Sequence, residues 1–133
     1  MSPTISCSSV YKIFGNNAQT LLTESGGNVD AKKFQEAGCI VGVNDASFEV
    51  NKGEMLVVMG LSGSGKSTLL RCISRLTDAT AGKILIDGED ICLMNSKQLI
   101  ELRREKMGMV FQNFALLPHK TVLENIAFPL QVK

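Results

Sequence analysis

The fold of this chain is decided by one stretch, Gly60-Leu61-Ser62-Gly63-Ser64-Gly65-Lys66-Ser67-Thr68. It matches the pattern G-x-x-x-x-G-K-[ST], which forms a phosphate-binding loop when a strand precedes it and a helix follows it. The apolar run at residues 55–59 predicts a buried strand in front of it. Apolar residues at helical spacing predict a helix that begins near Lys66, and they are Leu69, Leu70, Ile73 and Leu76. These flanks favour a true phosphate loop over a serine- and glycine-rich turn that matches by accident.

The residue types in this stretch suit a bound polyphosphate. Gly60, Gly63 and Gly65 allow the backbone to curl with its N–H groups inward, because no Cβ atom blocks the turn. Those N–H groups and the N-terminus of the following helix favour an anion. Lys66 can place a positive charge on the β- and γ-phosphates, and the Ser67 hydroxyl can ligate Mg²⁺. We therefore expect the chain to bind a nucleoside triphosphate, or to belong to a protein that does.

Length and composition bound what the chain can be. At 133 residues it is one domain at most. Its 14 basic and 13 acidic residues give a net charge of +1, which gives no reason to expect nucleic acid as a partner. No apolar run approaches the roughly 18 residues that span a bilayer, and no secretory signal is visible. The four cysteines and His119 predict no zinc site, so we expect reduced thiols in a cytosolic protein.

The residues before the phosphate loop predict a small sheet with an insertion. Residues 10–14 are β-prone, and residues 42–50 alternate apolar and polar side chains as a half-buried strand does. Between them, residues 15–38 are polar and without clear periodicity. We therefore expect a surface insertion, bounded at 15–41, that is helical at most over 30–37.

Two further strands are expected after the loop. Residues 83–87 predict a strand that Gly88 closes, and residues 107–112 return to strand character. Asp87 sits at the end of the first of these strands, without the apolar run that leads into the metal-binding acid of a phosphate-loop ATPase. We interpret Asp87 as a turn residue.

Two further helices are indicated by capping signals. Asn95 or Ser96 could cap a helix that runs through about Arg104. Thr121 and Glu124 have the spacing of a capping box, so a second helix should start there.

A second motif carries a resemblance to a known family. Its residues are Met109-Val110-Phe111-Gln112-Asn113-Phe114-Ala115-Leu116-Leu117-Pro118-His119-Lys120-Thr121-Val122. This stretch resembles the glutamine loop of ABC transporter ATP-binding subunits, in which a strand ends in Phe-Gln and leads to a Pro-x-x-Thr-Val helix start. The resemblance covers about residues 43–129. The amino-acid sequences of residues 59–67 and 114–119, together with the insertion, are most similar to those of the glycine betaine/proline uptake branch of the family.

The resemblance implies a fold and a domain. The fold is α/β, a P-loop NTPase core of an ABC ATPase domain joined to a small antiparallel β-subdomain. Residues 1–133 would form the N-terminal part of one such domain. The family's signature sequence Leu-Ser-Gly-Gly-Gln, its acidic strand with the catalytic glutamate and its switch histidine are absent from this sequence. We therefore expect an N-terminal fragment or a truncated product that binds nucleotide weakly and hydrolyses it poorly.

The resemblance also assigns roles to single residues. Lys66 and Gln112 would be catalytic, and Gln112 would reach the Mg²⁺ and the attacking water. The alternative for Gln112 is a polar cap that ends a strand. Tyr11 would stack on the adenine of ATP, and the alternative is an aromatic residue packed on a small sheet. Residues 114–117 are either core or a dock for the membrane subunit.

The function implied is ATP-driven import of glycine betaine- or proline-like osmolytes. Its cofactors are ATP and Mg²⁺. Its partners are a transmembrane permease subunit and a second ATP-binding subunit that dimerises on ATP. Its place is the cytoplasm, peripheral on the inner face of the plasma membrane. The alternatives are an ABC ATPase for amino acids or another solute, and a non-catalytic module that only binds nucleotide. A small-molecule kinase is disfavoured because Gln112 and its loop have no role there.

Overall fold

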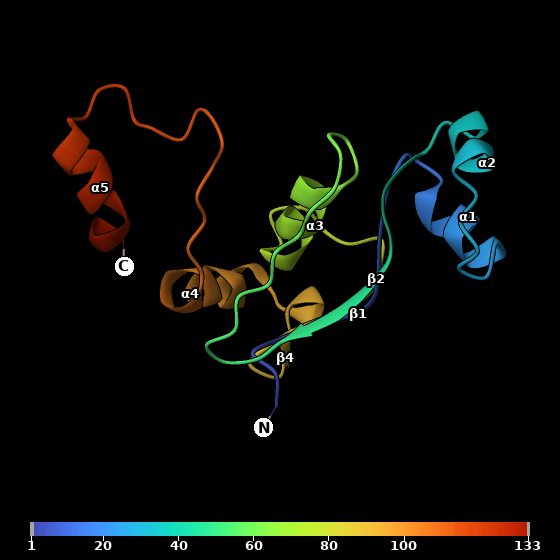
Figure 1. Cartoon of the computed structure of the whole chain (residues 1–133), viewed down its shortest axis with the longest axis horizontal. Coiled ribbons are helices and arrows are strands. Elements are labelled where there is room, and N and C mark those ends of the chain that lie inside the picture. The colour runs from blue at the N-terminus through green and yellow to red at the C-terminus, as the bar shows by residue number, and fades with distance from the viewer. Residues whose placement is uncertain (1, 133) are drawn as a thin grey trace. The chain divides into compact units, whose positions relative to one another are not determined.

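The computed structural model describes residues 2–132, which form two compact units (Figure 1). The first unit runs to Leu93 and the second begins at Met94. Within the described residues, no helix is both long enough and apolar enough to cross a lipid bilayer. The phosphate loop, residues 60–68, lies in the first unit, whereas Gln112 lies in the second.

The first unit is built on an antiparallel sheet, which confirms the small β-subdomain predicted from the sequence. Its strands are β1 (Ile5–Phe14), β2 (Ile40–Val50), β3 (Ala81–Ile86) and the short β4 (Glu89–Asp90), in the order β2-β1-β3-β4. The register pairs Ile5 with Val50 on one side and with Ile86 on the other. Val10 of β1 and Ile84 of β3 are fully buried and belong to the core of this unit.

A bulge in β1 shifts which side chains face the core. Ser9 has a φ of 45°, and the pairing register of β1 changes between Cys7 and Val10 on the β2 side. A β-bulge adds one residue and so reverses the alternation of side chains beyond it. Cys7 and Val10 are consequently both buried, although their spacing is three rather than two. Ile13 is buried separately, in the cluster formed with the insertion.

The insertion is more ordered than the sequence predicts. It contains two helices, α1 (Ala18–Glu24) and α2 (Ala31–Glu36). The second matches the expected segment, and Asp30 caps it by accepting from the backbone N–H of Lys32. The first was not expected. It forms because one side packs into a cluster of buried residues made of Ile13, Ala18, Leu22, Phe34 and Cys39.

Two predicted strands are absent, and this corrects the sequence analysis. Neither residues 55–59 nor residues 107–112 belong to a strand of the described chain. The apolar side chains at 55–59 and 109–111 are exposed. Met55 is 86% exposed and Val110 is 98% exposed. An apolar run becomes a strand only when a neighbouring strand takes up its backbone hydrogen bonds. The four-stranded sheet described above includes neither segment.

The remaining elements follow their local signals. The helix α3 (Lys66–Ile73) begins at the predicted residue and contacts β1 and β2. The turn after β3 contains Asp87 with a φ of 49°, as expected for a turn residue, and leads through β4 to a 3₁₀ turn, η1 (Ile91–Leu93). In the second unit, α4 (Ser96–Lys106) and α5 (Val122–Gln131) are both preceded by complete capping boxes, at Asn95 and Thr121.

Candidate functional site

The phosphate loop has a conformation that only glycine fits at its critical positions. Gly63 and Gly65 have φ values of 78° and 96°, which L-residues with a side chain rarely adopt. A Cβ atom on Gly65 would overlap the carbonyl oxygen of Gly42, so the loop lies directly against strand β2. A Cβ atom on Gly60 would lie 2.6 Å from the Oγ of Ser64. The loop is therefore compact, and its glycines permit backbone contacts that a side chain would block.

Lys66 closes the loop from within. Its Nζ donates hydrogen bonds to the carbonyl oxygens of Gly60 at 2.7 Å and Leu61 at 2.6 Å, and to the Oγ of Ser64 at 3.2 Å. The ammonium group is thus held over the loop with three oxygen acceptors around it. Phosphate oxygens are stronger acceptors than carbonyls because they are charged, so the same ammonium can exchange these contacts for a bound phosphate.

The start of α3 completes an anion-binding surface. This helix has no side-chain cap and no acidic residue in its first turn. The N–H groups that a helix leaves without internal acceptors are therefore available to an anion, in the positive end of the helix dipole. Ser67 is exposed in that first turn. No group of three or more His, Cys, Asp or Glu side chains in the described residues could hold a metal ion. The binding of Mg²⁺ by Ser67 stays a prediction.

An aromatic residue that the sequence analysis missed lies beside this surface. A Cβ atom added to Gly42 would lie 2.9 Å from the Phe14 ring and 3.0 Å from the Thr68 methyl group. The side chains of Phe14 and Thr68 therefore both lie next to Gly42. Phe14 is 43% exposed, and the Nζ of Lys12 lies 4.9 Å from the centre of its ring. Phe14 therefore offers an accessible ring next to the phosphate loop.

Tyr11, the aromatic residue selected from the sequence, lies elsewhere. Its ring packs against the cluster of buried residues in the insertion, and its hydroxyl donates to the carbonyl of Gly27 at 3.3 Å. The sequence left open an aromatic residue packed on a small sheet as the alternative to adenine stacking, and the role of Tyr11 stays a prediction. The signal for Phe14 was the two-residue period of a strand. Tyr11 and Ile13 share the face that meets the buried cluster of the insertion, so Phe14 belongs to the other face.

Gln112 lies in the second unit, in an exposed bend that follows residues 107–111. It does not end a strand in the described chain, contrary to the sequence prediction. Its role at the metal and at the attacking water stays a prediction.

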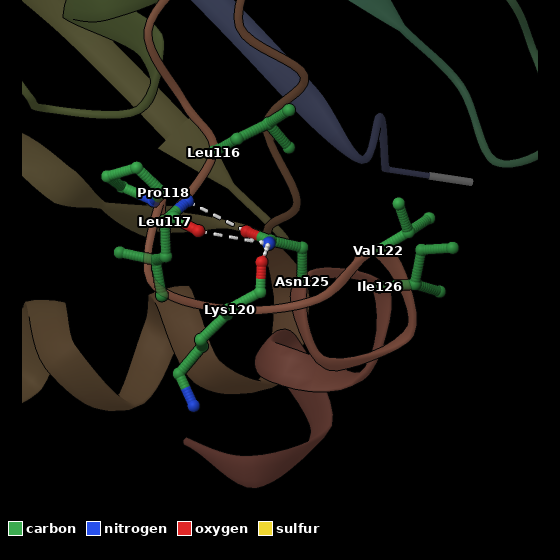
Figure 2. Close-up of a pocket in the computed structure, with 7 residues that line it drawn as sticks. All are labelled: Leu116, Leu117, Pro118, Lys120, Val122, Asn125 and Ile126. Carbon is green, nitrogen blue, oxygen red and sulfur yellow. Dashed lines mark hydrogen bonds between the residues drawn. The ribbon is translucent and has the colours of Figure 1, made fainter.

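The residues after Gln112 form an apolar pocket of about 300 Å³ (Figure 2). Its lining comes from the loop before α5 and from the first turns of that helix, and consists of Leu116, Leu117, Pro118, Lys120, Val122, Asn125 and Ile126. Leu116 is 77% exposed and Val122 is 78% exposed. From the sequence, residues 114–117 are either core or a dock for the membrane subunit, and within the described residues they are not core, since Phe114 and Leu116 are exposed.

Three of the four cysteines have thiols with raised pKa values. All four are free, and Cys7 and Cys72 are buried. Burial, with the neighbouring Cys92 and Cys72 thiols, raises the pKa of Cys7 to about 11. Burial also raises the pKa of Cys72 and of Cys92. These three groups therefore stay as thiols near neutral pH, and the thiolate is the reactive form.

Comparisons with known proteins identify relatives of this chain. A family model described as "ABC transporter" matches residues 43–133. The chain is 79% identical, over 131 residues, to the trimethylamine N-oxide transport system ATP-binding protein TmoW of Pelagibacter ubique; this alignment covers 98% of the chain and 38% of the relative. It is 44% identical, over 133 residues, to the glycine betaine/proline betaine transport system ATP-binding protein ProV of Escherichia coli, covering 99% and 33%. The chain thus spans little more than a third of these relatives.

Solved structures show the same fold. The chain aligns with a bacterial ABC transporter cassette solved as a dimer, with a TM-score of 0.74 and 31% identity, covering 96% of this chain and 47% of that one. A second structure of that cassette, with the same TM-score, is a post-hydrolysis state bound to ADP and Pi. The family match covers most of the sequence, and both the phosphate loop and the helix that follows it lie within it. This chain therefore belongs to the ABC transporter family of ATP-binding proteins.

Proposed function

We propose that this chain supplies the phosphate-binding part of an ATP-binding subunit that powers the import of a small osmolyte. The observation that carries the proposal is Lys66, which is already held over a formed phosphate loop. The fold relationship to a cassette bound to ADP and Pi supports nucleotide as the ligand.

The proposed cargo is trimethylamine N-oxide or glycine betaine. The relative with 79% identity is described as part of a trimethylamine N-oxide system, and more distant relatives are described as parts of glycine betaine systems. Both compounds carry a trimethylated nitrogen with a formal positive charge, so one transporter architecture can serve either. Because identity is higher to the trimethylamine N-oxide system, we place that compound first.

The proposed nucleotide contacts follow from the geometry of the first unit. Residues 60–68 would hold the phosphates through backbone N–H groups, and Lys66 would move from the loop carbonyls to the β- and γ-phosphates. Phe14 would stack on the adenine in place of Tyr11, because its ring is exposed beside Thr68. Stacking depends on the flat face of the base, so an aromatic ring of either residue type serves the purpose.

The proposed reaction is attack by water on the γ-phosphorus. Lys66 and the N–H groups at the start of α3 would stabilise the negative charge on the transferring group. A bound Mg²⁺ would neutralise charge on the phosphate oxygens. Ser67 would hold that ion, and Gln112 would approach it and orient the water when the site closes.

The proposed partners are a membrane permease and a second ATP-binding subunit. The related cassette forms a dimer, and the relatives are described as parts of transport systems. The apolar pocket after Gln112 would receive the permease, because its lining is exposed and follows the glutamine loop directly in the chain. The subunit would then work in the cytoplasm, on the inner face of the plasma membrane.

Transport by the complete subunit tests the proposal. The subunit would be assembled with its permease in proteoliposomes, and uptake of labelled trimethylamine N-oxide and glycine betaine would be measured with and without ATP. We expect ATP-dependent uptake of one of them, and its loss in a Lys66→Ala variant. Uptake of neither compound, with ATP binding preserved, would refute the cargo, and absence of ATP binding would refute the phosphate site.

A further inference from the structure

Asn125 has a side chain whose polar atoms are all used by one loop. Its Oδ1 accepts from the backbone N–H of Leu117 at 2.8 Å. Its Nδ2 donates to the carbonyls of Leu117 at 3.2 Å, Lys120 at 3.2 Å and Thr121 at 2.9 Å. Figure 2 shows the amide between the loop and the first turns of α5. A single side chain therefore joins the loop at residues 117–121 to the helix.

Other hydrogen bonds in the same segment also hold the loop at residues 117–121 and join it to the start of α5. The backbone N–H of Lys120 donates to the carbonyl of Leu117 at 3.1 Å. In the capping box, the N–H of Thr121 donates to Glu124 at 2.7 Å, and the N–H of Glu124 donates back to the Thr121 hydroxyl at 3.2 Å. These polar groups are all bonded within the turn, whereas the apolar side chains of Leu116, Val122 and Ile126 are exposed.

This arrangement keeps an apolar surface open that would otherwise collapse. Exposed apolar side chains on a flexible loop tend to fold onto one another, because water favours the smaller apolar area. Here the Asn125 amide fixes the loop backbone on one side of the pocket, while Val122 and Ile126 line the other from α5 (Figure 2). A pocket formed before binding loses less entropy when it is filled.

We propose that Asn125 is a positioning residue that holds this pocket ready for one apolar anchor of the permease. The inference rests on the proposed function, which makes the permease the partner. The occupant is an apolar side chain on a cytoplasmic segment of the permease, because carbon atoms dominate the lining. Lys120 is the charged member of the lining, so we expect an acidic residue next to the anchor.

The test compares Asn125→Asp with Gln131→Glu, which makes the same amide-to-carboxylate change at the other end of α5. Both are made in the complete subunit. Near neutral pH, Asn125→Asp replaces the donor Nδ2 with a charged oxygen facing three carbonyls. Hydrogen exchange of the amides at 117–121 should become about tenfold faster or more, since a lost hydrogen bond of about 1.4 kcal/mol is a factor of ten. Gln131→Glu should leave this exchange unchanged.

The second measurement is affinity for the purified permease in detergent, with Mg-ATP affinity as a check on folding. We expect Asn125→Asp to bind the permease about tenfold more weakly or worse, with ATP affinity within twofold of the parent. Unchanged exchange at 117–121 would overturn the positioning role. Faster exchange with parental permease affinity would overturn the role of the pocket. If the parent itself does not bind the permease, the proposed partner fails and this inference fails with it, while the proposal of ATP binding stands.

Discussion

The contact between the phosphate loop and strand β2 can be tested with two alanine substitutions that differ in one respect. Gly63 and Gly65 both have positive φ, so alanine at either position adopts an unfavourable backbone conformation. At Gly63 no heavy atom lies within 4 Å of the added Cβ, whereas at Gly65 the added Cβ overlaps the carbonyl oxygen of Gly42. Gly63→Ala is therefore the matched control for Gly65→Ala.

The expected losses in the free energy of unfolding follow from the backbone conformation and from the overlap of the added Cβ with Gly42. A left-handed conformation destabilises an L-residue by about 1–2 kcal/mol. The lower entropy of the unfolded alanine chain offsets about 0.4–1 kcal/mol of this. Gly63→Ala should therefore lower the free energy of unfolding by roughly 1 kcal/mol. Gly65→Ala should lose about 1–3 kcal/mol more, the usual range for atoms forced into a packed site.

The assay is urea unfolding followed by circular dichroism, with both variants and the parent measured at one protein concentration. The free energies are compared by linear extrapolation, and the slopes show whether the unfolded states are alike. Because the backbone term is common to both variants, the difference between them reports the contact with Gly42. Equal losses in the two variants would refute a close approach of the loop to β2.

Three further outcomes are expected. Lys66→Ala should weaken Mg-ATP binding roughly 10–150-fold, because charge-assisted hydrogen bonds contribute about 1.5–3 kcal/mol; calorimetric titration measures this, and parental affinity would remove Lys66 from the site. Phe14→Leu should weaken ATP binding by about 1–3 kcal/mol but leave tripolyphosphate binding unchanged, because only ATP carries the adenine. Tyr11→Leu should change the binding of neither ligand. The opposite pattern would show that Tyr11 stacks on the adenine. Acid should fray the N-terminus of α5. The hydrogen bonds from Thr121 lower the pKa of Glu124 from its usual 4.5, so the capping box is fully effective above about pH 4.5 and is lost as pH falls through the lowered pKa. Helix content against pH measures this, and a Glu124→Gln variant with the same acid response would contradict it.

Elements with local signals could be predicted from the sequence. The caps at Asn95 and Thr121 depend on residues three positions apart, and both helices start where the capping boxes place them. The start of α3 at Lys66 also follows from adjacent residues. In each case the atoms that satisfy the backbone are supplied within one turn, so no distant part of the chain is needed.

Elements that depend on distant partners were harder to predict. The helix α1 is stabilised by Phe34 and Cys39, which lie well beyond it in the sequence. The choice between Tyr11 and Phe14 depends on which face of β1 meets the insertion, and composition alone does not give this. The two-residue period of the strand does predict which face meets the insertion, because Ile13 is apolar and shares its face with Tyr11.

The phosphate loop shows how a site can form when one of its predicted supports is unpaired. Residues 55–59 precede it without strand pairing, yet Lys66 is bonded to the loop carbonyls and Gly65 lies against Gly42. The loop is therefore held from its C-terminal side, by the packing of α3 on β2 and by the ammonium group within it. The internal shape of the loop therefore does not depend on strand pairing of residues 55–59. For this reason, glycine conformation and the Lys66 contacts define the site more directly than the apolar run that first predicted it.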